Sequence, residues 1–146
     1  MKHLLPLLLL LLTLLPANAA TKKFEADPIN IAAIIVEKSD SSMIASTLDF
    51  YGYTFQTKED DYIVMKHPNG NEIRYSFSTL ESKYPIVEVK AKGTRKSIDK
   101  RLNELDFDKS GNGYEKIRNL YSKFKTQCNF GPRSTLIFRR SPNKKD

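Results

Sequence analysis

The sequence predicts an α+β fold in which helices pack on one face of an antiparallel β-meander. Three observations support this class: a strong hairpin signal within residues 61–77, amphipathic stretches with helical spacing on both sides of it, and a weak echo of the first half in the second. We expect one domain over residues 20–140. The echo leaves open whether that domain is a single unit or two unequal tandem α-β repeats, residues 28–92 and 93–140.

The hairpin signal is the turn Pro68-Asn69-Gly70 between two runs of β-branched and aromatic residues. A two-residue loop at Asn69-Gly70 would place Lys66 opposite Ile73. A three-residue loop, which suits the fixed φ of proline and the left-handed preference of glycine, places Lys66 opposite Glu72, and we favour it. Period-two alternation then gives an apolar face and a polar face. The apolar face holds Ile63, Met65, Ile73 and Tyr75, and the polar face holds Tyr62, Val64, Lys66, Glu72, Arg74 and Ser76.

Helix signals precede this hairpin. Asp27-Pro28 is a cap followed by proline at the first helical position, so residues 29–36 are read as a buried helix, with a buried strand as the alternative. A second cap cluster, residues 39–42, introduces a helix over residues 43–51. Strands are expected at residues 53–57 and 84–91, with an acidic turn at residues 58–60.

The second half repeats this order less clearly. Residues 94–105 predict a helix that ends in Leu105-Asp106-Phe107, an echo of Leu48-Asp49-Phe50. Residues 108–113 and 129–133 read as turns, and residues 134–140 as a strand. Residues 114–128 fit a helical stripe, but the repeat predicts two strands there, and we favour strands. Residues 141–146 read as a polar tail.

The first 19 residues have the pattern of a secretory signal peptide. A basic start, a leucine-rich core of about a dozen residues and the small residues Ala17-Asn18-Ala19 predict cleavage before Ala20. The core is shorter than the ~20 residues that span a bilayer, so a transmembrane anchor is disfavoured. We therefore expect a periplasmic or extracellular protein without a membrane span after cleavage.

The charge of the chain is uneven. Residues 20–82 hold 6 basic and 10 acidic residues, whereas residues 83–146 hold 17 basic and 7 acidic residues. The basic half alternates cations with aromatic residues, which is typical of surfaces that bind nucleic acid, anionic glycans or anionic lipids. The alternative interpretation is that the cations are ordinary solvated surface residues and that the aromatic residues belong to the core. The candidate cations are Lys123, Lys125, Arg133, Arg139 and Arg140.

One short motif points to calcium. The segment from Asp108 to Tyr114 resembles the first half of an EF-hand loop, and the resemblance implies ligands from Asp108, Ser110 and Asn112 and from the carbonyl of Tyr114. The twelfth loop position, where the family has a bidentate glutamate, is Asn119. A turn built from residues with favourable turn geometry is the competing interpretation.

No set of residues predicts catalysis. A thiol nucleophile would need Cys128 with His67, the only cysteine and the only histidine after the signal peptide. We interpret Cys128 instead as a small buried apolar residue, with an intermolecular disulfide as the alternative. No nucleotide-binding glycine loop, serine nucleophile motif or metal-ligand spacing occurs, so we predict neither catalytic residues nor a cofactor or metal.

These observations favour a non-enzymatic binding protein of the cell envelope or exterior, with an unknown protein as its partner. Its binding surface would be the polar sheet face that carries Tyr62, Val64 and Arg74. An anion-binding module in the basic half and a degenerate calcium-binding loop are the alternatives. The predicted architecture is loosely similar to small secreted protease- and lactamase-inhibitor folds, with which the chain shares no motif.

Overall fold

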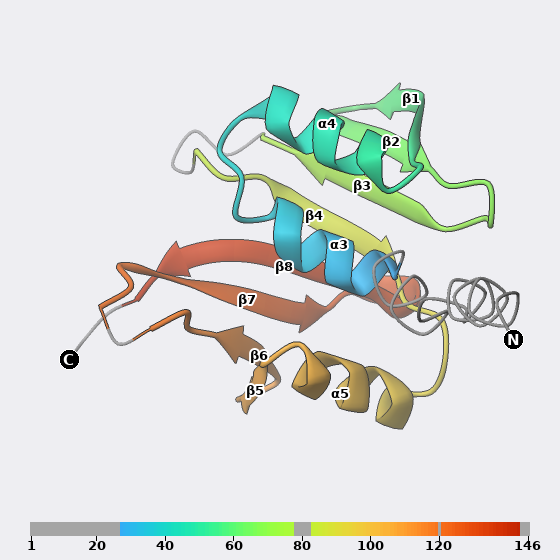
Figure 1. Cartoon of the computed structure of the whole chain (residues 1–146). Helices are drawn as coiled ribbons and strands as arrows, with labels where there is room; N and C mark the ends of the chain where they lie inside the picture. The colour runs from blue at the N-terminus through green and yellow to red at the C-terminus, as the bar shows by residue number, and fades with distance from the viewer. Residues whose placement is uncertain (1–26, 78–82, 120, 144–146) are drawn as a thin grey trace, which may run out of the picture.

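The computed structural model describes residues 27–77, 83–119 and 121–143. Within these residues, three helices pack on one face of an eight-stranded antiparallel sheet, which confirms the predicted α+β class (Figure 1). The predicted signal peptide and its cleavage site lie outside the described residues. None of the described helices has both the length and the hydrophobicity needed to cross a bilayer.

The sheet consists of two meanders that meet in the middle. Its strand order is β1-β2-β3-β4-β8-β7-β6-β5, so β1–β4 form one half and β5–β8 the other, joined by the antiparallel pair β4 and β8. The strands of the first half are β1 (Thr54–Glu59), β2 (Tyr62–Lys66), β3 (Glu72–Ser76) and β4 (Ile86–Lys90). Those of the second half are β5 (Asp108–Ser110), β6 (Gly113–Lys116), β7 (Phe124–Phe130) and β8 (Thr135–Pro142).

Helix α3 (Pro28–Ile35) lies over the junction between the meanders (Figure 1). The Asp27 carboxylate accepts the Ile29 amide hydrogen at 3.1 Å, and Pro28 occupies the first turn, as the sequence predicts. Because the helix is apolar nearly all round, it packs against β3, β4, β8 and a second helix, and four of its positions are fully buried or nearly so. Helix, rather than strand, is therefore the correct reading of residues 29–36.

Helices α4 (Ser41–Phe50) and α5 (Arg95–Glu104) occupy equivalent places in the two halves. Their caps Asp40 and Thr94 are 54 residues apart, as are the buried pairs Ile44 and Ile98, and Leu48 and Leu102. Both helices end in the same turn, in which an amide two residues beyond the cap bonds the leucine carbonyl: Tyr53 to Leu48 at 2.9 Å, and Phe107 to Leu102 at 3.0 Å.

The structural repeat therefore differs in alignment from the one expected from sequence. The letters Leu-Asp-Phe recur at 48–50 and 105–107, but Leu48 corresponds to Leu102 in the structure. The reason is that the helix end sets the equivalence, and there Gly52 and Asp106 share a left-handed backbone with φ of 82° and 62°. Because this position is a glycine in one half and an aspartate in the other, the sequence does not reveal that the two helix ends correspond.

The central hairpin has the favoured register. Lys66 pairs with Glu72, and the His67 amide donates to the Asn71 carbonyl at 2.9 Å around the loop Pro68-Asn69-Gly70. The predicted turn at residues 58–60 is wrong in its bounds, because β1 continues to Glu59 and the chain reverses at Asp60 and Asp61. Asp60 supplies the left-handed conformation there, with φ of 52°.

The second half contains one more hairpin than expected. Residues 108–113 are not a simple turn, because β5 and β6 pair around Gly111 and Asn112. Residues 114–128 supply strands rather than a helix, as favoured. Strand β7 runs to Phe130, so the next connection is the short 3₁₀ turn η1 (Pro132–Ser134), and β8 continues to Pro142 into the expected tail.

The two helix ends give a stability test. We expect Gly52→Ala to lower the free energy of unfolding by about 1–2 kcal/mol, because a left-handed backbone disfavours a Cβ atom. The added Cβ would also lie 3.1 Å from His67 Nε2. Asp106→Gly relieves a left-handed aspartate and should leave stability within about 1 kcal/mol of wild type. Urea unfolding of both variants measures the difference.

Equal losses in the two variants would contradict this prediction. They would mean that the left-handed position matters less than the side chains at the helix end. The ion pair of Asp106 with Lys116 does not complicate the comparison, since it is 3.9 Å long and the Asp106 side chain is 88% exposed.

Candidate functional site: the open face of the sheet

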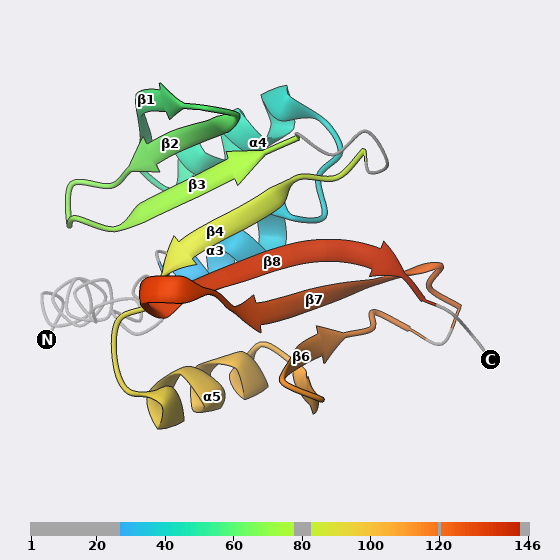
Figure 2. The same cartoon turned by 180° about the vertical axis from the view of Figure 1, so that it is seen from behind.

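The side of the sheet opposite the helices is not covered by any described element (Figure 2). We call this side the open face. Side chains alternate along a strand, so the partners of the buried core residues identify which positions lie on it. Its central residues are Tyr62, Val64 and Lys66 of β2, Glu72, Arg74 and Ser76 of β3, Ile86, Glu88 and Lys90 of β4, Ile137 and Arg139 of β8, and Lys125, Gln127 and Asn129 of β7.

Tyr62 and Arg74 form a packed pair on the open face. The Arg74 guanidinium carbon lies 5.1 Å from the centre of the Tyr62 ring, and Arg74 Nη2 lies 3.2 Å from Glu59 Oε2. The neighbouring Val64 is only 2% exposed although none of the described helices covers its side of the sheet. Long polar side chains therefore shield apolar surface here, and Arg74 is packed between the Tyr62 ring and the Glu59 carboxylate.

The same tyrosine connects to β4 and β8. Burial raises the pKa of Tyr62, and its hydrogen bond to Glu88 raises it further, whereas the positive charges of Arg74 and Arg139 lower it. The hydroxyl therefore stays protonated and donates to the Glu88 carboxylate. Tyr62, Arg74, Glu88 and Arg139 thus lie close enough together to influence one another across four neighbouring strands.

The predicted cations are divided between different surfaces. Lys125 and Arg139 lie on the open face, where Lys125 Nζ is 2.8 Å from Glu115 Oε1. Arg140 lies on the helix side, because it follows Arg139 in the same strand. Arg133 is exposed in η1, and Lys123 precedes β7. The sequence could not place them together because the β7–β8 register decides the face of each one.

The Arg140 side chain is packed against neighbouring side chains and is not free to meet a ligand from solvent. Its guanidinium carbon lies 5.3 Å from the Tyr84 ring centre and 5.6 Å from that of Phe124, and its Nη1 lies 3.4 Å from Glu37 Oε1. Glu37 also meets Arg118 Nη2 at 2.8 Å. This cluster ties the end of α3 to the second meander, so we assign Arg140 to the framework of the fold.

Sequence reasoning named Arg139 as a candidate but missed its neighbours at the β4–β8 pair. Ile86, Glu88, Ile137 and Arg139 lie together there, with Glu88 directly opposite Ile137. Alternation in residues 84–91 does place Ile86 and Glu88 on one face. Their contact with β8 depends on a pairing between segments about fifty residues apart, for which a single sequence contains no local signal.

The residues considered for catalysis and metal binding have other surroundings. Cys128 is fully buried in β7, and the His67 ring packs at a tilt of 55° against the Tyr53 ring, with ring centres 5.2 Å apart. The segment that resembles an EF-hand is a β-hairpin in which Asp108 pairs with Glu115 and Ser110 with Gly113. Across the described ranges, no three His, Cys, Asp or Glu residues are grouped so as to hold a metal ion.

A small cavity of about 260 Å³ lies beside the β1–β2 turn. It is smaller than the ~300–1,000 Å³ of most ligand pockets. Its lining residues are Lys58, Asp61, Ile63, Tyr75, Ser76 and Phe77. The open face is much the larger feature, so we take it as the candidate site.

Comparison with known protein families, with curated proteins and with solved structures finds no match to this chain.

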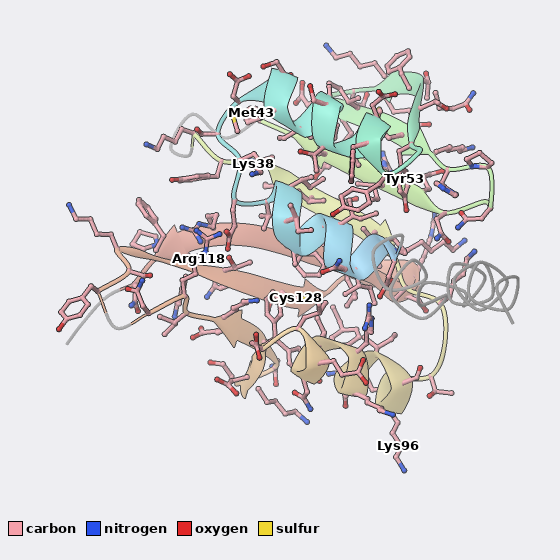
Figure 3. All side chains as sticks on the ribbon, viewed as in Figure 1. Lys38, Met43, Tyr53, Lys96, Arg118 and Cys128 are labelled. Carbon is pink, nitrogen blue, oxygen red and sulfur yellow. The ribbon has the colours of Figure 1, made fainter. Side chains whose placement is uncertain are left out.

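The cysteine provides a test of the core. Burial raises the pKa of Cys128 to about 12, so at pH 8 the thiol is protonated as well as shielded (Figure 3). We expect a thiol reagent such as DTNB to label the native protein at least about a hundredfold more slowly than the protein in urea, because labelling requires opening of the fold. Rapid native labelling, or a dimer that reducing agent dissociates, would contradict this arrangement.

The cluster around Glu37 provides a second test. We expect Glu37→Gln to lower the free energy of unfolding by about 2 kcal/mol, because Arg140 would lose its carboxylate while only 14% exposed. The matched control is Glu72→Gln, which removes the 3.6 Å surface pair with Lys66 and should cost less than about 1 kcal/mol. Equal costs in chemical unfolding would show that Glu37 has no special place in the fold.

Proposed function

We propose that this chain is an exported, non-enzymatic interaction protein of the periplasm or the extracellular space, and that it binds another protein through its open face. The observation that carries this proposal is the eight-stranded sheet, which has one side that no helix of the described residues covers and which is lined there by packed aromatic, guanidinium and aliphatic groups. The predicted signal peptide supports the location.

The composition of the open face suits a protein partner. Tyrosine and arginine are enriched at the centres of protein interfaces because each offers a large contact area together with hydrogen bonds. Tyr62 and Arg74 already hold each other in place, which reduces the side-chain entropy lost on binding. Ile86 and Ile137 add partly exposed apolar surface at the middle of the sheet.

The alternative of a polyanion-binding module has weaker support. Carboxylates alternate with the cations of the open face, and the pairs Arg74–Glu59, Lys66–Glu72 and Lys125–Glu115 are already formed. A nucleic acid or an acidic glycan brings a row of negative charges, which these carboxylates would repel. A protein surface that carries both positive and negative side chains is more complementary to these alternating charges than a polyanion is. The degenerate calcium loop has no support from the geometry of the β5–β6 hairpin.

Site-specific photo-crosslinking in the natural host tests the proposal. A photoreactive amino acid is placed at Lys90, which is exposed on the open face, and in a matched variant at Lys96, which is exposed on α5 (Figure 3). We expect the Lys90 variant, recovered from the envelope or the culture fluid, to carry a discrete crosslinked protein. The Lys96 variant should not, because α5 lies on the other side of the sheet.

The open face would be excluded as the binding surface if Lys90 gave no crosslink, or if Lys96 gave the same product in the same yield. Both positions are exposed lysines, so differences in folding or in the chemistry of the replaced side chain cannot explain a difference between them. A crosslink from Lys96 alone would move the binding surface to the helix side.

A further inference from the structure

The middle of the open face has an uneven charge balance. Four side chains lie on the open face where β4 pairs with β8. Glu88 is opposite Ile137, and two residues further along each strand, just past the Val87–Phe138 pair, come Ile86 and Arg139. The two isoleucines form one diagonal of this group and the two charged residues form the other. We call these four residues the seam.

Arg139 is one of two cations on these strands that form no ion pair with a carboxylate of the described residues. Glu88, the acid on the diagonal, accepts the hydrogen bond of Tyr62 and keeps its negative charge. The other open-face cations next to carboxylates form ion pairs, but no ion pair involves Arg139 in the described part of the chain. Lys90, at the end of β4, is likewise without one. The strands of the seam thus have an excess of positive charge within an otherwise balanced surface.

We propose that the partner protein presents a single Asp or Glu side chain to Arg139, with neighbouring apolar side chains on Ile86 and Ile137. This inference rests on the proposed function and specifies its partner. A guanidinium can hold a carboxylate through two parallel hydrogen bonds, and the contact strengthens once the flanking isoleucines and the partner exclude water. One carboxylate satisfies Arg139, whereas further negative charges would meet Glu88 or Glu59.

The first experiment uses two synthetic peptides as defined probes. Acetyl-Leu-Glu-Leu-amide and its neutral twin acetyl-Leu-Gln-Leu-amide are titrated into the ¹⁵N-labelled full chain, and the Nε–H resonance of Arg139 is followed by NMR. We expect a saturable shift in the millimolar range, since short flexible peptides bind weakly. The glutamate peptide should bind about fivefold more tightly than its twin, the upper range for an exposed ion pair.

Arg133 is the internal control for this titration. It is an exposed arginine in η1, away from the seam, so its Nε–H should shift little. Equal affinity for the two peptides, or equal shifts at Arg139 and Arg133, would overturn the proposal. So would tighter binding at Arg139 by a heparin-type oligosaccharide than by the glutamate peptide. Arg139→Gln should remove the preference for glutamate, and Arg139→Lys should keep part of it.

The second experiment separates this inference from the proposed function. The photoreactive Lys90 variant is combined with Arg139→Glu or with Arg139→Lys. We expect the crosslink yield to fall several-fold with Glu and to persist with Lys. An unchanged yield with Glu would leave the open face as the binding surface and would overturn the carboxylate contact. Absence of any crosslink in the parent Lys90 variant would overturn both, since the seam would then have no partner.

Discussion

The pairing of β4 with β8 under helix α3 is the constraint on which the rest of the structure depends. Each meander has four strands, but only this pair turns them into one sheet. On the helix side it places Val87 against Phe138 and Val89 against Leu136, and all four side chains are buried. Helix α3 covers these residues with Ile31 and Ile35, which are fully buried. The centre of the core is therefore shared between both repeats and the first helix.

This arrangement explains why one side of the sheet is left open. The described residues supply α3 for the junction and one further helix for each meander, and these helices pack on the same side (Figure 1). An uncovered antiparallel sheet must then present polar groups to water on its other side. The alternation of the strands provides them, but Val64, Ile86 and Ile137 interrupt the polar pattern near the middle. Binding another protein gives a physical reason for apolar groups at that place.

The sequence contains enough local information for the elements and too little for their long-range assembly. The Pro68-Asn69-Gly70 turn defines the first hairpin register, and the caps Asp27, Asp40 and Thr94 define the three helix starts. These features depend on residues within a few positions of one another. The β5–β6 hairpin was mistaken for a turn because its strands are only three and four residues long.

The candidate site was predictable only where it lies within one hairpin. Tyr62, Val64 and Arg74 were placed on one face because β2 and β3 are neighbours in sequence as well as in space. Arg139 was singled out for its charge and its aromatic neighbours, but its place beside Ile86 follows from a pairing across residues 91–134. The pairing of strands across so long a connection depends on the packing of the whole core. No short sequence motif indicates it.

Three consecutive residues in β8 show that the fold and the site depend on one register. Phe138 is fully buried and packs on Phe107, with ring centres 5.9 Å apart. Arg139 faces outward on the open face, and Arg140 returns to the helix side to meet Glu37. A slip of one residue would bury the Arg139 charge and expose Phe138, at a cost of several kcal/mol, which is a large share of the net stability of a small domain. The packing that fixes the core therefore also fixes Arg139 at the seam, so the position of the proposed binding group does not require any separate stabilising interaction.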